Sequence, residues 1–367
     1  MRITLVISTG GAGGAERAIS TMANYWAARD REVTILTLSS EAGDWYELHP
    51  RVKRVGLNLL SASAHLGEAL RNNLRRVRSL RRELRRARPD VVISFVDKTN
   101  VLTLLASVGL RVPVIVSERT DPRQHGIGFA WNGLRRWLYP RADAVVMQSR
   151  GLHAWACGFV RSNSVYVIPN SVKPVLNGTE YPSNQQGSGH TVIAMGRLSK
   201  EKRFDLLLRA FCQCARRHDD WSLIILGEGE ERGSLEALIG ELDLKDRVSL
   251  PGRVRDPTRI LQGADLFVLS SRFEGFPNAL LEAMACGLAV ISTDCGSGPR
   301  EIIRDGLDGL LVPANDLDAL ASSMDRLMID HEERQRLGAR AEEVIERFSI
   351  EKIMTMWDDL LTNTCKG

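Results

Sequence analysis

Strand-length apolar segments alternate with helix-length patterns along the whole chain, and this alternation constrains the fold more than any other feature. Strands separated by helix-length connections must run parallel, because only such connections return the chain to the same edge of a sheet. The sequence therefore predicts an α/β protein with parallel sheets. The expected strands are Arg2–Ser8, Val33–Leu38, Val91–Phe95, Val112–Val116, Ala144–Met147 and Val165–Pro169, followed by Thr191–Met195, Ser222–Leu226, Val248–Leu250, Leu266–Ser270, Ala289–Ser292 and Gly309–Val312.

The strand series is interrupted once, which predicts two domains. Residues 177–190 are rich in Asn, Gly, Ser, Gln and Pro and are expected to form a polar linker. A chain of 367 residues also exceeds the length at which a single core usually stops growing. We expect one domain over residues 1–175 and a second over 190–349, followed by an amphipathic helix at Ile350–Leu361.

Composition is that of a soluble globular protein, with 44% apolar and 26% charged residues. No apolar run reaches the ~20 residues of a membrane-spanning helix, and the apolar start Met1–Ser8 is too short for a signal peptide. The six cysteines include no C-x-x-C pair and no zinc-ligand spacing, so we expect idle thiols in a reducing compartment. The protein is expected to stay in the cytoplasm.

Charge is unevenly distributed along the chain. The net charge is +4, but residues 1–172 carry +12 and the remainder carries −8. A basic half beside an acidic half predicts that the basic half meets a polyanion or an anionic surface.

The basic charge is concentrated in one predicted helix over residues 66–88. Its apolar residues recur every three or four positions and are expected to pack inward as one stripe. The stretch 71–88 holds nine arginines and one acid, Glu83, and the guanidinium fork suits phosphate oxygens. Contact with phosphates of a lipid or a membrane surface is favoured over a merely solvated face. The stripe is Leu66, Leu70, Leu74, Val77, Leu80, Leu84 and Ala87, and the arginines are 71, 75, 76, 78, 81, 82, 85, 86 and 88.

The segment Glu274–Glu282 carries the strongest chemical signal. It follows the apolar run Leu266–Ser270 and opens a helix, with Pro277 suited to the first turn. Free amides at a helix start bind anions, and carboxylates such as Glu274 and Glu282 accept hydrogen bonds from hydroxyl groups. This combination predicts a sugar-phosphate site, although a helix with a good N-terminus and one exposed Glu remains the structural alternative.

Four other polar segments follow predicted strands and should reach the same sheet edge. Arg197 and Lys202 are placed to meet phosphates, while the glycine turns can present backbone to a base or ribose. A further glycine-rich turn near the N-terminus lacks the third glycine of a dinucleotide fingerprint, because Glu16 occupies that position. The segments are Gly196–Lys202, Gly227–Gly229, Gly252–Val254 and Gly296–Glu301, and the N-terminal turn is Gly10–Gly14.

In the first half, Ser117, Glu118 and Arg119 follow a predicted strand at a ligand-binding edge. The stretch 129–139 mixes aromatic and cationic side chains, which fits an interfacial surface and a packed helix about equally well.

Together, the Glu274-x7-Glu282 motif, the Gly196-Arg197 and Glu201-Lys202 pairs, and the glycine turn with Glu16 and Arg17 resemble the retaining glycosyltransferase family 4 over nearly the whole chain. The resemblance implies a GT-B architecture, in which two Rossmann-like domains with parallel sheets face a cleft. It implies an N-terminal acceptor domain, a C-terminal nucleotide-sugar donor domain, and a last helix, about 350–367, that packs back onto the first domain.

Within the family, Ser117–Arg119 and the arginine-rich helix look most like bacterial enzymes that extend undecaprenyl-diphosphate-linked oligosaccharides or exopolysaccharides. This likeness implies transfer of a hexose or N-acetylhexosamine from a UDP-sugar to a polyprenyl-diphosphate-linked glycan, at the inner face of the cell membrane. Many family members have a histidine where this chain has Arg119, and His125 is a conceivable substitute.

The resemblance also implies residue roles. Arg197 and Lys202 would bind the nucleotide diphosphate, Glu282 the ribose, and Glu274 the transferred sugar, so Glu274, Arg197 and Lys202 are the predicted catalytic residues. The remaining donor-site residues are Gly11, Gly13, Gly14, Val254, Gly275, Phe276, Pro277 and Asn278, and the predicted acceptor-site residues are Glu16, Arg75, Arg78, Arg82, Glu118 and Arg119.

No metal cofactor is implied, and the UDP-sugar is a substrate. The chain's Asp-x-Asp, Asp316 to Asp318, follows Asn315 at a predicted helix start, where helix capping is favoured over metal binding.

Three other functions stay open on the sequence. The first is a sugar-nucleotide epimerase of GT-B shape, which would need no acceptor. The second is a nicotinamide-dependent dehydrogenase, which the missing third glycine disfavours. The third is nucleic-acid binding, which would explain the arginines but not the paired glutamates, so no nucleic-acid partner is expected.

Overall fold

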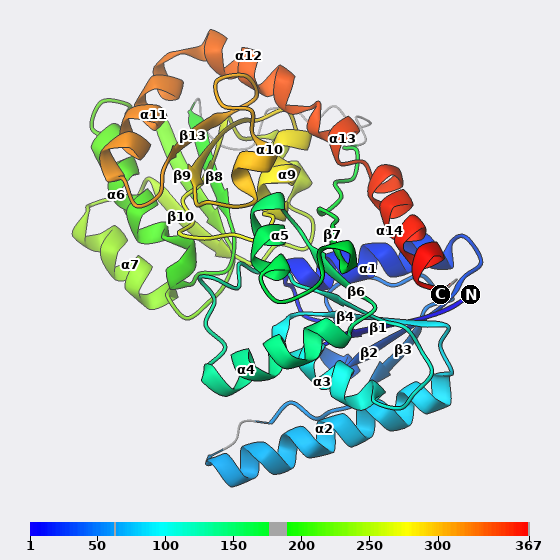
Figure 1. The fold of residues 1–367 in the computed structure, drawn as a ribbon. Helices are drawn as coiled ribbons and strands as arrows, with labels where there is room; N and C mark the ends of the chain where they lie inside the picture. Colours follow the sequence, from blue (N-terminus) through cyan, green and yellow to red (C-terminus); the bar gives the residue numbers. More distant parts are fainter. Residues whose placement is uncertain (62–63, 176–188, 366–367) are drawn as a thin grey trace. The chain divides into compact units, whose positions relative to one another are not determined.

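The computed structural model describes residues 1–61, 64–175 and 189–365, and it forms two compact units. The N-terminal unit contains Met1–Asn170 and Glu351–Gly367, and the C-terminal unit contains Ser171–Ile350. Each unit is a parallel sheet covered by helices, which confirms the predicted fold class (Figure 1). The expected linker 177–190 lies outside the described residues up to position 188.

The N-terminal sheet has seven strands in the order β3-β2-β1-β4-β5-β6-β7. One of them, β3, was not predicted, because an edge strand with Lys53 and Arg54 carries no buried apolar run. The strands are β1 (Arg2–Ile7), β2 (Glu32–Thr37), β3 (Lys53–Gly56), β4 (Val91–Phe95), β5 (Val114–Ser117), β6 (Ala144–Met147) and β7 (Val165–Val167).

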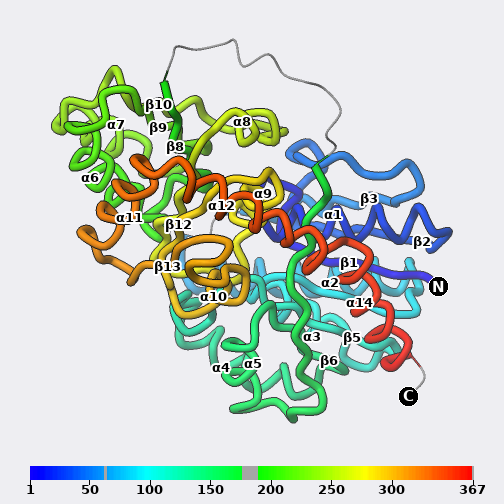
Figure 2. The backbone as a smooth tube through the Cα atoms, turned by 90° about the horizontal axis from the view of Figure 1, so that it is seen from above, coloured from blue at the N-terminus to red at the C-terminus, as the bar shows by residue number. Residues whose placement is uncertain are grey.

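The helices of this unit include the last helix of the chain, α14, which lies beside α1 in Figure 2. Trp357 of α14 is 1% exposed with its ring 6.4 Å from that of Phe95, and the Trp26 indole donates to Asp358 at 2.8 Å. These contacts join the C-terminal helix to the N-terminal core. The helices are α1 (Gly14–Ala27), α2 (Leu66–Ala87), α3 (Asp97–Ser107), α4 (Phe129–Leu138), α5 (Arg150–Cys157) and α14 (Ile350–Cys365).

The C-terminal sheet has six strands in the order β10-β9-β8-β11-β12-β13. Its strand order reverses between β8 and β11, and open parallel sheets bind ligands beside such a reversal, at the carboxyl ends of the strands. The strands are β8 (His190–Met195), β9 (Trp221–Leu226), β10 (Val248–Gly252), β11 (Leu266–Leu269), β12 (Ala289–Asp294) and β13 (Leu310–Pro313).

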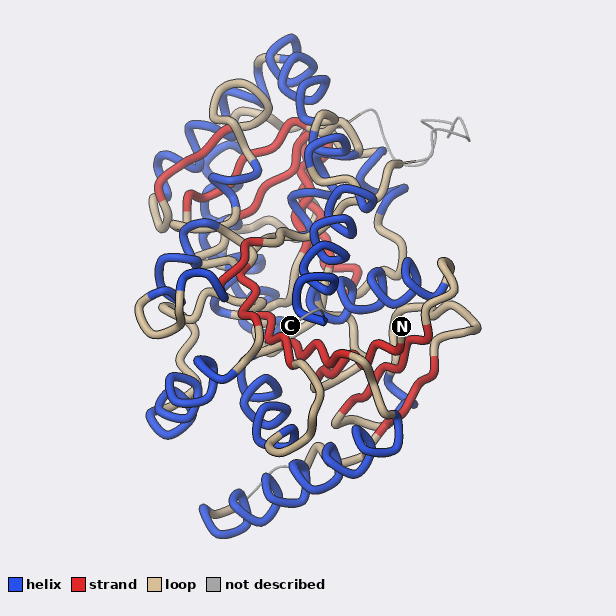
Figure 3. The backbone as a smooth tube through the Cα atoms, turned by 45° about the vertical axis from the view of Figure 1, so that its right-hand side comes forward, coloured by secondary structure: helices blue, strands red, loops and turns tan. Residues whose placement is uncertain are grey.

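Helices cover both faces of this sheet, as the strands and helices coloured in Figure 3 show. Successive side chains of β8 alternate between the two faces: Val192 and Ala194 join one apolar cluster, and Ile193 joins the other. The helices are α6 (Phe204–Ala215), α7 (Arg232–Glu241), α8 (Thr258–Gln262), α9 (Asn278–Ala285), α10 (Pro299–Ile302), α11 (Leu317–Ile329), α12 (His331–Ala341) and α13 (Val344–Arg347).

Asp316 caps α11, because its carboxylate accepts a hydrogen bond from the amide of Ala319 at 2.9 Å. The predicted capping role is therefore confirmed. Among the described residues, no helix combines the length and the apolar character needed to cross a membrane, and no group of three or more potential metal-binding side chains is found there either.

The predicted inward-facing stripe of α2 is only half right. Leu80 and Leu84 are buried, but Leu66, Leu70 and Leu74 are 90%, 72% and 44% exposed. A helix of 22 residues spans ~33 Å, whereas a five-residue strand spans about 17 Å. The N-terminal half of α2 therefore extends past the sheet and leaves its apolar stripe uncovered.

Candidate active site

In the C-terminal unit, the turns after β8, β9 and β10 pack backbone against backbone. The amide of Gly196 donates to the carbonyl of Leu226 at 2.9 Å, and the amide of Gly227 donates to that of Gly252 at 2.8 Å. Gly227 has φ of +148°, and a Cβ there would clash with the carbonyl of Gly196. Only glycine fits at this position. The turn after β10 leads directly to Val254, a predicted donor-site residue, which is partly buried.

Across the strand-order reversal, the structure brings two of the predicted catalytic residues into direct contact. Lys202 Nζ lies 2.5 Å from Glu274 Oε1, and the hydroxyl of Ser271 donates to the same oxygen at 2.6 Å. The side chains of Lys202 and Glu274 are 22% and 12% exposed. The third predicted catalytic residue, Arg197, is exposed in the turn after β8. No hydrogen bond or ion pair of its guanidinium occurs among the described residues.

The backbone around this ion pair is held by neighbouring loops. The hydroxyl of Ser270 donates to the Lys202 carbonyl at 2.8 Å, and the amide of Arg272 donates to the Glu201 carbonyl at 2.7 Å. Lys202 itself ends a short 3-10 helix, Lys200–Lys202. The loops after β8 and β11 are therefore tied together, which limits the movement of both charged side chains.

Pro277 forms the N-cap of α9, and the amides of the first turn begin at Asn278. Phe276 is 5% exposed, and its ring packs edge-on against that of Phe348. The turn after β12 supports this segment: the Ser297 hydroxyl donates to the Glu274 carbonyl at 2.7 Å, and a Cβ at Gly298 would clash with the carbonyl of Gly275.

The pKa values of two cysteine thiols, Cys286 and Cys295, are raised by the acidic side chains of this segment as well as by burial. Burial, followed by the charge of Glu282, raises the pKa of Cys286 to about 12. Burial, followed by the charge of Glu274, raises the pKa of Cys295 to about 12. The partly buried Glu282 lies one helical turn before Cys286 on α9. The two glutamates of the Glu274-x7-Glu282 motif therefore each lie near a protonated cysteine.

The N-terminal unit carries the remaining predicted residues, beginning with the glycine turn after β1. Gly11 and Gly13 are partly buried, Gly14 is exposed, and Gly13 caps α1. The Thr9 hydroxyl donates to Glu16 at 2.5 Å, and a Cβ at Gly13 would clash with the Glu16 carboxylate. Glu16 is thus folded back over the turn.

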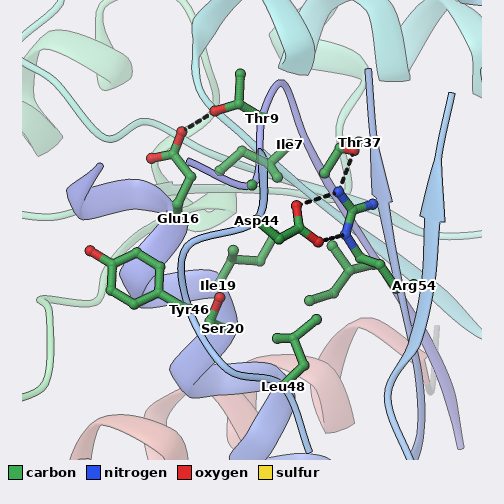
Figure 4. A pocket seen from close by; sticks show the side chains of 12 residues that line it. Ile7, Thr9, Glu16, Ile19, Ser20, Thr37, Asp44, Tyr46, Leu48 and Arg54 are labelled. Atoms are coloured by element: carbon green, nitrogen blue, oxygen red, sulfur yellow. Dashed lines mark hydrogen bonds and ion pairs between the residues drawn. The ribbon is translucent and has the colours of Figure 1, made fainter. Parts of the chain in front are cut away.

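A small pocket adjoins this turn (Figure 4). Asp44 and Arg54 face each other in it at 2.6 Å, and Arg54 also donates to Thr37 at 2.7 Å. The Trp45 amide donates to the Gly10 carbonyl at 2.8 Å, so the loop after β2 is fixed against the glycine turn. The pocket is lined by Ile7, Thr9, Gly10, Glu16, Ile19, Ser20, Ile35, Thr37, Asp44, Tyr46, Leu48 and Arg54.

Glu118, at the end of β5, is fully buried. It accepts hydrogen bonds from Arg135 at 3.1 Å and from the Tyr139 hydroxyl at 2.5 Å, while Asn100 donates to Tyr139 at 3.0 Å. Burial raises the pKa of Tyr139, and the Glu118 charge raises it further. Arg135 and Tyr139 are also buried. Phe129–Leu138 forms the helix α4, on which Phe129 and Trp137 are 95% and 54% exposed.

Arg119 is partly buried beside this network. It donates to Asn170 at 2.6 Å and to the Ser117 hydroxyl at 3.4 Å, and its guanidinium lies 5.1 Å from the centre of the Phe95 ring. His125, considered above as a substitute for the missing histidine, instead lies 3.4 Å from Asp97 at the start of α3. Arg75, Arg78 and Arg82 are exposed on α2.

Three amide side chains of this network were not predicted from the sequence. Asn100 donates to Tyr139, Gln148 donates to Asn170, and Asn170 accepts from Arg119. Their signal is weak, because single amide residues occur at strand ends and in loops of most proteins. Asn170 directly follows the expected strand Val165–Pro169, so position alone offered a hint.

The two halves of the chain each match a family model of glycosyltransferases. Residues 13–171 match the family model of the glycosyl transferase 4-like domain, and residues 182–344 match that of glycosyl transferases group 1. The chain is 29% identical over 363 residues, covering 98% of both chains, to the Campylobacter jejuni GalNAc-alpha-(1->4)-GalNAc-alpha-(1->3)-diNAcBac-PP-undecaprenol alpha-1,4-N-acetyl-D-galactosaminyltransferase.

A second relative from Campylobacter jejuni is 30% identical over 272 residues, which cover 72% of this chain and 74% of the relative. It is an N-acetylgalactosamine-N,N'-diacetylbacillosaminyl-diphospho-undecaprenol 4-alpha-N-acetylgalactosaminyltransferase. Among solved structures, sucrose-phosphate synthase from Thermosynechococcus elongatus superposes with a TM-score of 0.84 at 20% identity, over 99% of this chain and 98% of the other.

The structure of Anabaena HepE in complex with UDP and glucose gives a TM-score of 0.81 at 21% identity, over 98% and 99% of the two chains. These likenesses between structures show the shared fold, and the family models and sequence relatives show the kind of enzyme. The chain therefore belongs to the group 1, family 4-type glycosyltransferases of GT-B fold.

Proposed function

We propose that this glycosyltransferase moves a hexose or N-acetylhexosamine from a UDP-sugar to a polyprenyl-diphosphate-linked glycan, with retention of anomeric configuration. The observation that carries the donor half is the contact between Lys202 and Glu274 at the strand-order reversal of the C-terminal sheet. It puts a cation for phosphate and a carboxylate for sugar hydroxyls within one small site.

Different site residues bind different parts of the nucleotide-sugar donor. Arg197 and Lys202 bind the diphosphate, Glu274 accepts hydrogen bonds from the transferred sugar, and Glu282 accepts them from the ribose. The backbone at Gly275, Phe276, Pro277 and Asn278 holds the phosphate and the sugar, since a helix start is an anion-binding site. The amides of Gly275, Phe276 and Asn278 donate, whereas Pro277 has no N–H and fixes the helix start. Val254 and the turn before it face the base, and Gly11, Gly13 and Gly14 serve donor and acceptor from the N-terminal unit.

Departure of the leaving group is the difficult step of the reaction. As the bond between the anomeric carbon and the β-phosphate oxygen breaks, negative charge grows on the diphosphate. Arg197, Lys202 and the start of α9 stabilise this charge as fixed positive groups, and preorganised groups of this kind contribute the largest share of many rate enhancements. We propose that no metal cofactor is required, so EDTA should leave the initial rate unchanged.

The helix α2 supports the proposed lipid-linked acceptor. Arg75, Arg78 and Arg82 are exposed on the same helix as the exposed Leu66, Leu70 and Leu74. Cations beside uncovered apolar side chains fit a diphosphate attached to a lipid at an anionic membrane surface. The two Campylobacter relatives are named for acceptors of this class. We propose that the protein works as a peripheral enzyme on the cytoplasmic face of the membrane.

Glu16, Glu118 and Arg119 complete the acceptor side. Glu16 stands at the glycine turn with its carboxylate bonded to Thr9. Because Glu118 is fully buried and bonded to Arg135 and Tyr139, we propose that it positions the neighbouring Arg119 rather than touching the acceptor.

A transfer assay tests the proposal. The protein is incubated with a panel of UDP-hexoses and UDP-N-acetylhexosamines and a polyprenyl-diphosphate-linked disaccharide, and the lipid product is weighed by mass spectrometry. We expect a product heavier by one sugar, with UDP released only when acceptor is present. Conversion of the UDP-sugar without acceptor would indicate an epimerase instead, and absence of transfer from every donor would refute the proposal.

A further inference from the structure

Arg119 is a shielded cation that the protein leaves without an acidic partner. Its guanidinium donates to the side-chain oxygens of Asn170 and Ser117, both neutral, and lies over the ring of Phe95. No ion pair of Arg119 occurs in the part of the chain that the structure describes, and its Nε is buried there without a hydrogen-bond partner. A sheltered charge of this kind is costly unless a counter-ion compensates it.

The nearby acids are bonded elsewhere. Glu118 pairs with Arg135 at 3.1 Å, Asp121 pairs with Arg123 at 2.7 Å, and Glu16 is bonded to Thr9. Burial lowers the pKa of Arg119 to about 9, and the more distant charge of Glu16 opposes this shift. Arg119 therefore remains protonated at neutral pH, and no acid among the described residues forms an ion pair with it.

Two amide side chains fix the guanidinium without neutralising it. The Asn170 oxygen accepts from Arg119 at 2.6 Å and from the Gln148 amide nitrogen at 2.8 Å. Gln148 and Asn170 are 2% and 6% exposed, so neither can turn away to solvent. A carboxylate at position 170 would hold Arg119 as well but would cancel its charge, whereas an amide oxygen keeps the charge available.

We infer that Asn170 and Gln148 are positioning residues that hold the Arg119 guanidinium, still uncompensated, for a phosphate of the acceptor's diphosphate. A guanidinium binds two phosphate oxygens at once, which a histidine at this position does not. The inference rests on the proposed function, because it requires that the acceptor carry a diphosphate.

Steady-state kinetics of four variants test the inference. Arg119→Gln removes the charge and Asn170→Asp cancels it with little change in size, so both should raise the KM for the lipid-diphosphate acceptor by about tenfold or more, as loss of a charge-assisted bond does. The KM for UDP-sugar should stay unchanged, and Arg119→Lys should recover part of the acceptor affinity. Arg111→Gln, an exposed arginine of the same unit, is the matched control and should behave as wild type.

A binding measurement separates this inference from the proposed function. Farnesyl diphosphate, with farnesol as its uncharged control, is titrated by calorimetry into protein saturated with UDP. Farnesyl diphosphate should bind about tenfold or more weakly to Arg119→Gln and Asn170→Asp than to wild type, and farnesol should not distinguish them.

If wild type transfers sugar to the lipid acceptor but the variants change neither KM nor farnesyl diphosphate affinity, the inference is overturned and the proposed function stands. If the variants weaken UDP binding alone, the assignment to the acceptor is likewise overturned. If no transfer occurs but the variants weaken farnesyl diphosphate binding as expected, the anion site is supported and the proposed function fails.

Discussion

Lys202 and Glu274 form an ion pair at the proposed donor site. Lys202 Nζ lies 2.5 Å from Glu274 Oε1, so each charge has the opposite charge beside it. We propose that Lys202 contacts phosphate and Glu274 contacts sugar hydroxyls of the nucleotide sugar, while the Ser271 hydroxyl still donates to Glu274. Groups that are already oriented need little rearrangement in the transition state.

Removing the cations should therefore slow the reaction. Arg197→Ala or Lys202→Ala should lower turnover by ~10²-fold or more, because each removes a group that stabilises charge on the leaving diphosphate. Initial rates at saturating donor measure the effect. Lys200→Ala is the control, since Lys200 is exposed in the same segment and should leave turnover unchanged. Wild-type turnover in both test variants would contradict the assignment.

The two thiols near the glutamates give a pH-based test. With pKa values of about 12, Cys286 and Cys295 remain protonated at pH 8, and the thiol form is not the nucleophile. Iodoacetamide at pH 8 should therefore label Cys286 and Cys295 more slowly than Cys365, which is exposed although burial of its thiol also raises its pKa. Mass spectrometry of peptides reads the result. Raising the pH above 8 should speed the labelling of these two partly buried thiols. Rapid labelling of either at pH 8 would contradict the acidic, sheltered surroundings described above.

Single residues also show where sequence reasoning reached its limit. Arg197, Lys202 and Glu274 could be proposed as site residues from the sequence because each follows a predicted strand and bears a charge. Asn170 could not, since its importance lies in the two side chains that meet at its oxygen, Arg119 and Gln148. Glu118 was found, but only the structure shows that it is buried against Arg135 and Tyr139.

At the scale of one element, α2 has a buried end and an exposed end. Its last two turns pack through Leu80 and Leu84, while its first two turns leave leucines in solvent among arginines. Periodicity predicted the helix and its stripe, but it does not reveal how far a neighbouring sheet extends. The uncovered half is the part that a membrane or a lipid can contact.

Charge reversal on α2 should affect lipid-linked acceptors selectively. Arg75→Glu, Arg78→Glu and Arg82→Glu combined should lower turnover with a polyprenyl-diphosphate acceptor, because three phosphate-binding cations become repulsive anions. Turnover with a short soluble acceptor should stay near wild type. The control combines Arg85→Glu, Arg86→Glu and Arg88→Glu, an equal charge change at the buried end of the helix. Equal losses with both acceptors would indicate misfolding instead.

The exposed leucines should matter for membranes and not for stability. Leu66→Ser, Leu70→Ser and Leu74→Ser combined should reduce sedimentation with anionic vesicles, since fewer apolar side chains can enter the interface. The Tm should hardly change, because exposed side chains contribute little burial. Ile329→Ser, at a residue 69% exposed in the C-terminal unit, should leave vesicle binding unchanged. Unchanged vesicle binding by the triple variant would contradict the proposal that α2 contacts the membrane surface.

At the scale of the whole molecule, the chain builds the same kind of parallel sheet twice and gives the two copies opposite charge. The sequence predicted twelve of the thirteen strands that the described residues form, because buried parallel strands are continuous apolar runs. It missed β3, whose edge position needs no such run. The packing of α14 in the N-terminal unit was expected only from the family resemblance. The apolar periodicity of an amphipathic helix does not indicate which unit the helix packs against.

Hydrogen exchange with and without UDP tests the central claim most directly, because it reports which strand ends hold the diphosphate. UDP at a hundred times its Kd stabilises its site by ~2.7 kcal/mol. We expect the added protection at residues 196–202 and 275–280 of the C-terminal unit, and expect Arg197→Ala with Lys202→Ala to abolish it at the same UDP concentration. Protection confined to the N-terminal glycine turn, or no protection at any UDP concentration, would contradict the claim.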